Sequence, residues 1–446
     1  MLLTLVEMAP AAAQVFTSGS TGADGAFTPT TSTTLTLPPN GIFNFTTITI
    51  PAGVTIRFAR NTGNTPVILL ATGLVTIAGT LDVSGANGGF GVINGVALGP
   101  NGGAAGPGGF DGGAGGNGVV ATGGGAGLGP GGGAGAPLPA SSLGVNGVGG
   151  GGGFLVAGAA SNNSPPNPGG AGYGTSPLVP LVGGSGGGGG SAPAGHTGGG
   201  GGGGGGAILV ASSTGITFSA GTILAKGGLG VATSPVVQVP GPGSGGGGSG
   251  GAVRLVAPSI TGTGTINASG GLSTAGPGIS AGSAGRVRLE AFTNTAAITY
   301  AATPLTAIST STPLPALLAT APSLRITAID GVTVPASPSG AFATPDAILP
   351  VGTVNPVEIT VSGSNIPPGT AVTISVSGQV GVATSTTATL TGTLASSSAS
   401  ASVTVPTNQA SAVSVWASFT LTAATDSGST YDDDGDEAVP VIVVSR

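Results

Sequence analysis

Alternation of apolar and polar residues predicts β-strands along most of the chain. Residues 48–50 (Ile-Thr-Ile) and 54–58 (Val-Thr-Ile-Arg-Phe) show the two-residue period of strands with one buried face. Turn sequences at 38–41 (Pro-Pro-Asn-Gly), 51–53 (Pro-Ala-Gly) and 61–63 (Asn-Thr-Gly) separate such segments. Residues 15–81 are therefore predicted to form short strands that cap a larger β structure.

A repeated five-residue pattern predicts stacked strands. It occurs at 67–71, 207–211, 253–257 and 287–291, and each segment ends in alanine. Aligned on that alanine, the first, third and fifth positions are apolar in all four segments, which predicts one continuous buried face. The other face changes from Ile68 and Leu70 to Arg288 and Glu290. We therefore expect the early outer rungs to be covered on both sides and the late ones to face water.

Three of the four segments continue into a second strand, at 80–85, 222–227 and 265–270. Recurring strands that cannot bury their apolar face alone are typical of a solenoid, here a parallel β-helix or an equivalent stacked sheet. The final alanines are unevenly spaced, and glycine-rich sequence accounts for the extra length. We expect these glycine-rich segments to form loops at the turns of the solenoid.

Glycine is concentrated in the middle of the chain, because residues 81–290 hold 75 of the 93 glycines. Ordering glycine costs more backbone entropy than ordering any other residue, so the loops must either stay mobile or gain contacts. Chains without side chains can pack closely in an extended polyproline-II geometry and hydrogen-bond to one another. We favour partial order of this polyglycine-II-like kind, covering the outer apolar face.

The composition changes again toward the C-terminus. Residues 293–322 are rich in Thr, Ala and Pro, which predicts an irregular connection. Residues 323–446 contain regularly spaced strand patterns, which favours an immunoglobulin-like β-sandwich without its disulfide. The strands are expected at 324–327, 357–361, 371–376, 387–394, 401–405, 413–421 and 439–444.

The N-terminal residues 1–14 are apolar and end in Ala11-Ala12-Ala13, which resembles a signal cleavage site. No Lys or Arg precedes Arg57, so the segment is interpreted either as a truncated secretory signal, which we favour, or as an apolar strand. The expected organisation is all-β: a leader at 1–14, a strand cap at 15–81, a glycine-rich β-helix body at 82–292, a connection at 293–322 and a sandwich at 323–446.

Charge and residue content exclude several classes of function. Only 22 of 446 residues are charged, Cys is absent, and His196 is the single histidine. Disulfides, Cys/His metal sites and histidine relays are therefore excluded, and the scattered basic residues make nucleic acid an improbable partner. No apolar run approaches the roughly 20 residues of a transmembrane helix. A nearly uncharged chain suits a secreted or cell-surface protein that associates.

The acidic segment 426–437 is the best candidate for a metal site. It holds six of the fourteen acidic residues, and Asp432, Asp434, Asp436 and Glu437 could supply oxygen ligands to calcium. Its spacing departs from the EF-hand pattern. A solvated hairpin loop is the competing interpretation, and bound calcium would have a structural role. No other cofactor is expected.

Three further features are candidate contact sites. Trp416 shares a strand face with Ser414 and Ser418, so it is either an interface residue or covered by a loop. Threonines at 28–36 could form an ice-binding array, but the aligned inner rungs are Val, Leu and Ala, so β-propensity explains them better. Arg254, Arg286, Arg288 and Glu290 share one strand face, and the alignment places Arg254 beside Arg288 if their coils are adjacent. β-Helix polysaccharide lyases use basic residues with carboxylates on such a face. One carboxylate is too few for that chemistry, and a salt bridge or solvated face is favoured.

Recurring phrases give the chain a family resemblance. They include 37–41 (Leu-Pro-Pro-Asn-Gly), 64–67 (Asn-Thr-Pro-Val), 108–113 (Gly-Gly-Phe-Asp-Gly-Gly) and 249–266, from Ser-Gly-Gly-Ala to Gly-Thr-Gly-Thr-Ile. Over most of 15–446 the chain resembles large secreted bacterial glycine-rich proteins that join a β-helix to an Ig-like tail. The resemblance implies an extracellular location and carries over no active site.

These observations together predict a structural protein rather than an enzyme. We expect an extracellular or cell-surface subunit of a fibre, filament or matrix that associates with copies of itself. An adhesin or glycan-binding module is the first alternative, and a polysaccharide-active β-helix enzyme is a weaker one.

Overall fold

The protein is described by a computed structural model that covers, with gaps, most of the chain from residue 16 onward. The described residues are 16–91, 99–117, 121–138, 147–162, 165–178, 181–231, 243–274, 279–300, 307–311, 313, 323–335, 338, 345–378, 384–407, 411–420 and 440–445. All regular elements among them are β-strands, so the all-β prediction is confirmed. No helix in this part of the chain has the length and apolar character needed to cross a bilayer.

Fourteen strands form one sheet in which every pair is parallel. Its strands are β1 (Ala26–Phe27), β2 (Thr33–Thr36), β3 (Ile42–Phe45), β4 (Thr47–Ile50), β5 (Thr55–Ala59), β6 (Val67–Ala71), β7 (Val75–Ile77), β8 (Thr80–Asp82), β9 (Ala207–Ser212), β10 (Ile216–Leu224), β11 (Ala252–Asn267), β12 (Arg286–Asn294), β13 (Ala297–Tyr300) and β14 (Ala307–Ser311).

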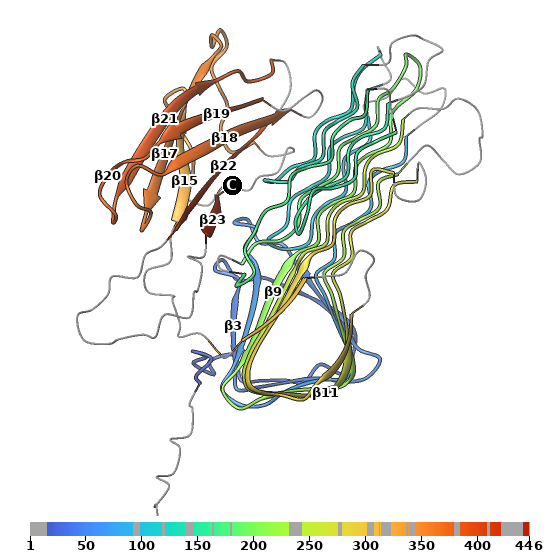
Figure 1. Ribbon diagram of the computed structural model, residues 1–446, viewed down its shortest axis with the longest axis vertical. Helices are drawn as coiled ribbons and strands as arrows, with labels where there is room; N and C mark the ends of the chain where they lie inside the picture. Colours follow the sequence, from blue (N-terminus) through green and yellow to red (C-terminus); the bar gives the residue numbers. More distant parts are fainter. Residues whose placement is uncertain are drawn as a thin grey trace, which may run out of the picture.

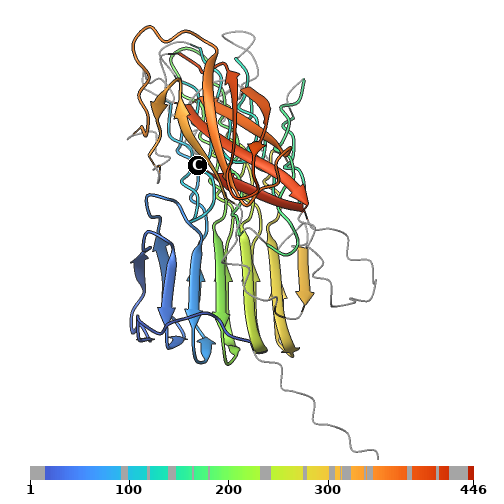
Figure 2. The ribbon, with the colours of Figure 1, turned by 90° about the vertical axis from the view of Figure 1, so that its left-hand side faces the viewer.

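The sheet folds around itself into three ladders of stacked strands. The first ladder contains β3, β6, β9, the start of β11, β12 and β14. The second contains β1, β4, β7, the start of β10 and the middle of β11. The third contains β2, β5, β8 and the ends of β10 and β11, followed by β13. Figure 1 shows the ladders as the sides of a triangular outline, and Figure 2 shows their strands side by side in sequence order.

Alternate side chains from all three ladders meet in one apolar core. Ile48, Leu69, Ile223, Leu255 and Val287 are each at most 1% exposed. Because side chains on a strand alternate between faces, the residues between them point outward. The predicted inner positions are confirmed in β6, β11 and β12, where Val67, Val253 and Val287 belong to this core.

The predicted alignment of the second repeat is wrong by one residue. Val67 pairs with Ile208, and Ile208 pairs with Val253, so Ile208 and Val210 point into the core. Leu209, expected inside, lies on the outer face. All five residues of 207–211 are apolar, so this segment contains no alternation that could set its register.

The glycine-rich segments form a second body, here called the Gly bundle. Its described segments leave the sheet after β8, β10 and β11 and return to β9, β11 and β12. In Figure 1 they run as extended, nearly parallel chains away from the triangular sheet. The segments are 83–91, 99–117, 121–138, 147–162, 165–178, 181–206, 225–231, 243–251, 268–274 and 279–285.

Backbone hydrogen bonds with a three-residue period hold the Gly bundle together. Every third backbone N–H group of the run Gly198–Gly206 donates to carbonyl oxygens of the same neighbouring segment. Residues 200, 203 and 206 donate to the carbonyl oxygens of 89, 86 and 83. Residues 198, 201 and 204 donate to those of 116, 113 and 110, and residues 199, 202 and 205 donate to those of 243, 246 and 249. Carbonyls of the run accept from 103–106, 184–190 and 228–231. The run therefore contacts six surrounding segments, and its glycines are all buried.

Close packing explains why the central segments are glycine. A Cβ atom on Gly201 would lie 2.0 Å from the carbonyl oxygen of Gly187, and one on Gly202 would lie 2.0 Å from that of Gly228. Each neighbouring atom is backbone that is itself held by hydrogen bonds, so it cannot move aside cheaply. Gly201 and Gly202 thus face different segments, and each excludes a side chain.

The described residues between 323 and 445 form two antiparallel sheets over a shared core. One sheet has the order β16-β15-β17-β21-β20 and the other the order β19-β18-β22-β23. Both contribute to the core, for example through Ile326 and Val361 from one sheet and Ile374 and Val415 from the other. The strands are β15 (Ser323–Ile329), β16 (Val332–Thr333), β17 (Val357–Ser364), β18 (Ala371–Gly378), β19 (Thr384–Thr389), β20 (Thr391–Gly392), β21 (Ser397–Val403), β22 (Ser411–Thr420) and β23 (Pro440–Ser445).

Candidate functional site

A cluster of charged residues lies on the outer face of the first ladder. Its members alternate with core residues, since Arg254 lies between Val253 and Leu255 on β11, and Arg288 and Glu290 flank Leu289 on β12. The register pairs Arg254 directly with Arg288, as the sequence alignment predicted. Two like charges on adjacent strands would repel each other unless a counter-ion lay between them.

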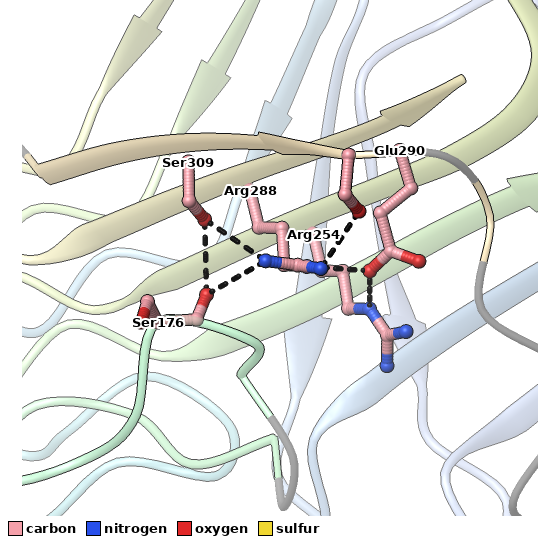
Figure 3. Close-up of polar contacts among 6 residues, drawn as sticks. Ser176, Arg254, Arg288, Glu290 and Ser309 are labelled. Carbon is pink, nitrogen blue, oxygen red and sulfur yellow. Dashed lines mark hydrogen bonds and ion pairs between the residues drawn. The ribbon is translucent and has the colours of Figure 1, made fainter. Parts of the chain in front are cut away.

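Glu290 supplies that counter-ion. Its Oε1 atom accepts from Nε of Arg254 at 2.7 Å and from Nε of Arg288 at 2.8 Å (Figure 3). The Glu290 side chain is fully buried, and the two arginine side chains are 16% and 9% exposed. The expectation that the late outer rungs face water is therefore wrong.

Arg288 also connects a segment of the Gly bundle to the sheet. Arg288 donates to Oγ of Ser311 at 2.7 Å and to Oγ of Ser309 at 3.3 Å, both on β14. Ser309 in turn donates to the carbonyl oxygen of Ser176 at 3.0 Å, as Figure 3 shows. The cluster thus connects β11, β12 and β14 with residues 165–178.

Arg286 makes a second connection to the Gly bundle. Its Nη2 donates to the carbonyl oxygens of Tyr173 and Leu155 at 3.3 and 3.4 Å, and its guanidinium lies 5.8 Å from the ring centroid of Phe154. Phe154 and Tyr173 pack with Ala207 and Ala252 in a small apolar cluster. Burial in this cluster lowers the pKa of Arg286, because desolvation disfavours the charged form.

This arrangement suits attachment better than acid–base chemistry. The carboxylate of Glu290 already accepts two charged hydrogen bonds, and arginine does not act as a proton donor at ordinary pH. Among the described residues no group of three His, Cys, Asp or Glu side chains could hold a metal ion. The described contacts of the Glu290 carboxylate thus join two strands of the sheet.

The other predicted site residues are the four calcium candidates and Trp416. Asp432, Asp434, Asp436 and Glu437, the calcium candidates, lie outside the described residues. Trp416 lies on β22, where Val415 and Ala417 point into the core of the two C-terminal sheets. Trp416 is half-buried on the opposite face, next to Thr373 of β18 in the hydrogen-bonded register.

The sequence did not predict another set of side-chain contacts between the sheet and the Gly bundle, made by Arg60 and Asn64. Both terminal nitrogens of Arg60 pair with the carboxylate of Asp111, which also accepts from the backbone of Ala105. Asn64 donates to the carbonyl oxygen of Gly109 at 2.9 Å. The oppositely charged Arg60 and Asp111 were a visible signal, because few residues of this chain are charged.

Two columns of threonine also escaped sequence reasoning. Their side chains stack on the outer faces of consecutive strands. The second ladder carries Thr49, Thr76, Thr217 and Thr261, and the third carries Thr55, Thr80, Thr222, Thr265 and Thr299. Such cross-strand pairs stabilise the sheet.

Comparisons with known proteins provide no functional assignment for this geometry. No protein-family model matches the chain, and no curated protein or solved structure matches it significantly.

Proposed function

We propose that this protein is an extracellular structural subunit that associates with copies of itself into a fibre, filament or surface matrix. In this proposal the three ladders are a parallel β-helix, the Gly bundle is a polyglycine-II-like lattice, and the C-terminal sheets are an Ig-like sandwich. Parallel pairing around one core supports the β-helix, and the three-residue hydrogen-bond period supports the polyglycine-II-like lattice. Two antiparallel sheets over one core support the Ig-like sandwich.

The Gly bundle is the observation that carries the structural role. Its central run, Gly198–Gly206, bonds through its backbone to six surrounding segments and has no side chains that could recognise a ligand. A hydrogen-bonded body of this kind resists deformation, because neighbouring segments support each other on several sides. The low charge of the whole chain adds little repulsion between copies.

Electron microscopy and sedimentation velocity of the full chain at several concentrations test this function. We expect filaments or regular sheets whose mass grows with protein concentration. Dispersed monomers at every concentration would contradict the proposal.

A glycan-binding surface module is the second candidate, and one surface of the Gly bundle favours it. Phe90, Leu229 and Leu272 are 60%, 40% and 55% exposed, and backbone bonds from Gly88 to Leu229 and from Gly230 to Leu272 join their segments. Exposed apolar residues gathered on one surface are typical of contact sites. Saturable binding of monomeric protein to immobilised glycans, abolished by Leu229→Ser with Leu272→Ser, would support this candidate.

A further inference from the structure

Among the described residues, the third ladder ends on both sides in a strand with a single partner strand. At its beginning β2 pairs with β5, and at its end β13 pairs with β11. Within the described residues, no backbone group of Thr33–Thr36 or Ala297–Tyr300 bonds to anything beyond these partners. Each end of this ladder thus presents free N–H and C=O groups, which template pairing with another strand.

Neither strand carries the charged side chains or the proline that commonly protect an edge. Natural edge strands are blocked by charged side chains, proline, bulges or a covering element. The sequences Thr-Thr-Leu-Thr of β2 and Ala-Ile-Thr-Tyr of β13 contain no charge and no proline. The first ladder differs at its beginning, where Asp24 donates its N–H to the carbonyl oxygen of Asn44 and accepts the N–H of Asn44 through its carboxylate.

We propose that copies of this chain stack end to end, with β13 of one copy pairing in parallel with β2 of the next. This inference rests on the self-association proposed above and names the surfaces that carry it. The two edges belong to the same parallel ladder, so a second copy placed by translation and twist continues it with the same strand direction. A contact between two different surfaces produces an open filament when its rotation does not close a ring, and end-to-end stacking along the ladders favours the filament.

The outer threonine column indicates the register of the contact. Thr33 pairs with Ile56, which places Ser32 beside Thr55, and Ser32 accepts the N–H of Thr55 through its hydroxyl. The column therefore runs from Ser32 to Thr299 at the far end of the ladder. In the stacked pair, Thr299 of one copy lies beside Ser32 of the next at the rung spacing of about 4.8 Å.

Disulfide trapping tests this register directly, because the chain has no cysteine of its own. In the double variant Ser32→Cys with Thr299→Cys, oxidation at concentrations that form filaments should produce a covalent ladder of multimers on non-reducing gels. The matched control, Thr222→Cys with Thr299→Cys, moves one cysteine to the middle of the same column and should produce no ladder. Equal crosslinking of both variants would overturn the proposal.

Blocking one edge at a time provides the second test. Thr34→Lys with Thr36→Lys blocks β2, and Ala297→Lys with Thr299→Lys blocks β13. Each variant alone should raise the concentration needed for filaments at least tenfold, and an equimolar mixture should stop at heterodimers. The control Thr222→Lys adds a charge to the same column away from the edges and should assemble like the parent chain.

The outcomes separate this inference from the function on which it rests. If the parent chain stays monomeric, the proposed self-association and the stacking both fail. If the parent forms filaments while the folded edge variants assemble equally well, self-association stands and the stacking through β2 and β13 is wrong. Thermal melting of each variant establishes that it is folded. The disulfide test uses different variants, so it stands even if the lysine variants do not fold.

Discussion

The ladders and the Gly bundle stabilise packed extended chains in two different ways. Both hold extended chains side by side with backbone hydrogen bonds. The ladders add alternating side chains that bury an apolar core, whereas the bundle removes side chains so that each central segment has neighbours on all sides. The difference shows that cohesion can come from apolar burial or from backbone proximity, and that each solution excludes the residues that the other needs.

Adding a side chain to the centre of the Gly bundle should have the largest effect. Gly201→Val places a branched side chain where a single Cβ already lies 2.0 Å from the carbonyl oxygen of Gly187. We expect a loss of more than about 4 kcal/mol in the free energy of unfolding, or failure to fold. Urea denaturation measures it. Gly63→Ala is the control, because its Cβ would make an ordinary 3.6 Å contact. Equal stability of both variants would contradict the packing argument.

Removing a side chain from the ladders is the converse experiment. Leu255→Ala deletes a fully buried core residue and leaves a cavity, which should cost about 4 kcal/mol. Leu272→Ala removes an exposed leucine from the bundle surface and should change stability by less than about 0.5 kcal/mol. If both substitutions cost the same in denaturant titrations, the ladders do not depend on their core.

The charged cluster joins the two regions and can be broken at its centre. Glu290→Gln removes the negative charge between Arg254 and Arg288, so that two buried arginines face each other without a counter-ion. We expect a loss of about 3 kcal/mol, the lower limit for breaking a buried ion pair. Thermal melting measures this loss. The control is Asp82→Asn, which removes the ion-pair partner of Arg57. The Arg57 side chain is 60% exposed, so this substitution should cost little stability.

The smallest expected effect is a pH dependence at the end of the third ladder. Burial raises the pKa of Tyr300 above its ordinary value of about 10. The unfolded chain therefore ionises this tyrosine at lower pH than the folded chain does, so stability falls as the pH rises above about 10. Urea titrations at pH 8 to 11 should show a smaller loss for Tyr300→Phe than for the parent chain. Identical slopes would show that Tyr300 does not contribute.

Several elements of the fold could be predicted because their signal is local. Alternation in 253–257 and 287–291 places Val253, Leu255 and Leu289 in the core without knowledge of any neighbour. The same alternation predicts strands at 357–361 and 371–376, and β17 and β18 occupy these positions. It also placed Arg254 beside Arg288, because both occupy the second position of an aligned repeat.

The candidate site was only partly predictable. The sequence shows that Arg254, Arg288 and Glu290 share a face, but their burial depends on what covers that face. Ser176 and Tyr173 supply carbonyl oxygens from segments more than 100 residues away. Their sequence positions contain nothing that indicates this partnership, because a backbone carbonyl is available at every residue.

The amino-acid sequence by itself determined the β character of the chain, the inner positions of most repeats and the absence of cysteine chemistry, since these depend on composition and two-residue periodicity. Only the tertiary structure decided the register of 207–211, the burial of Glu290 and the neighbours of Gly198–Gly206. The physical reason is the same in each case. A uniformly apolar or all-glycine segment has no side-chain pattern that specifies its partners, so spatial packing against distant segments selects them.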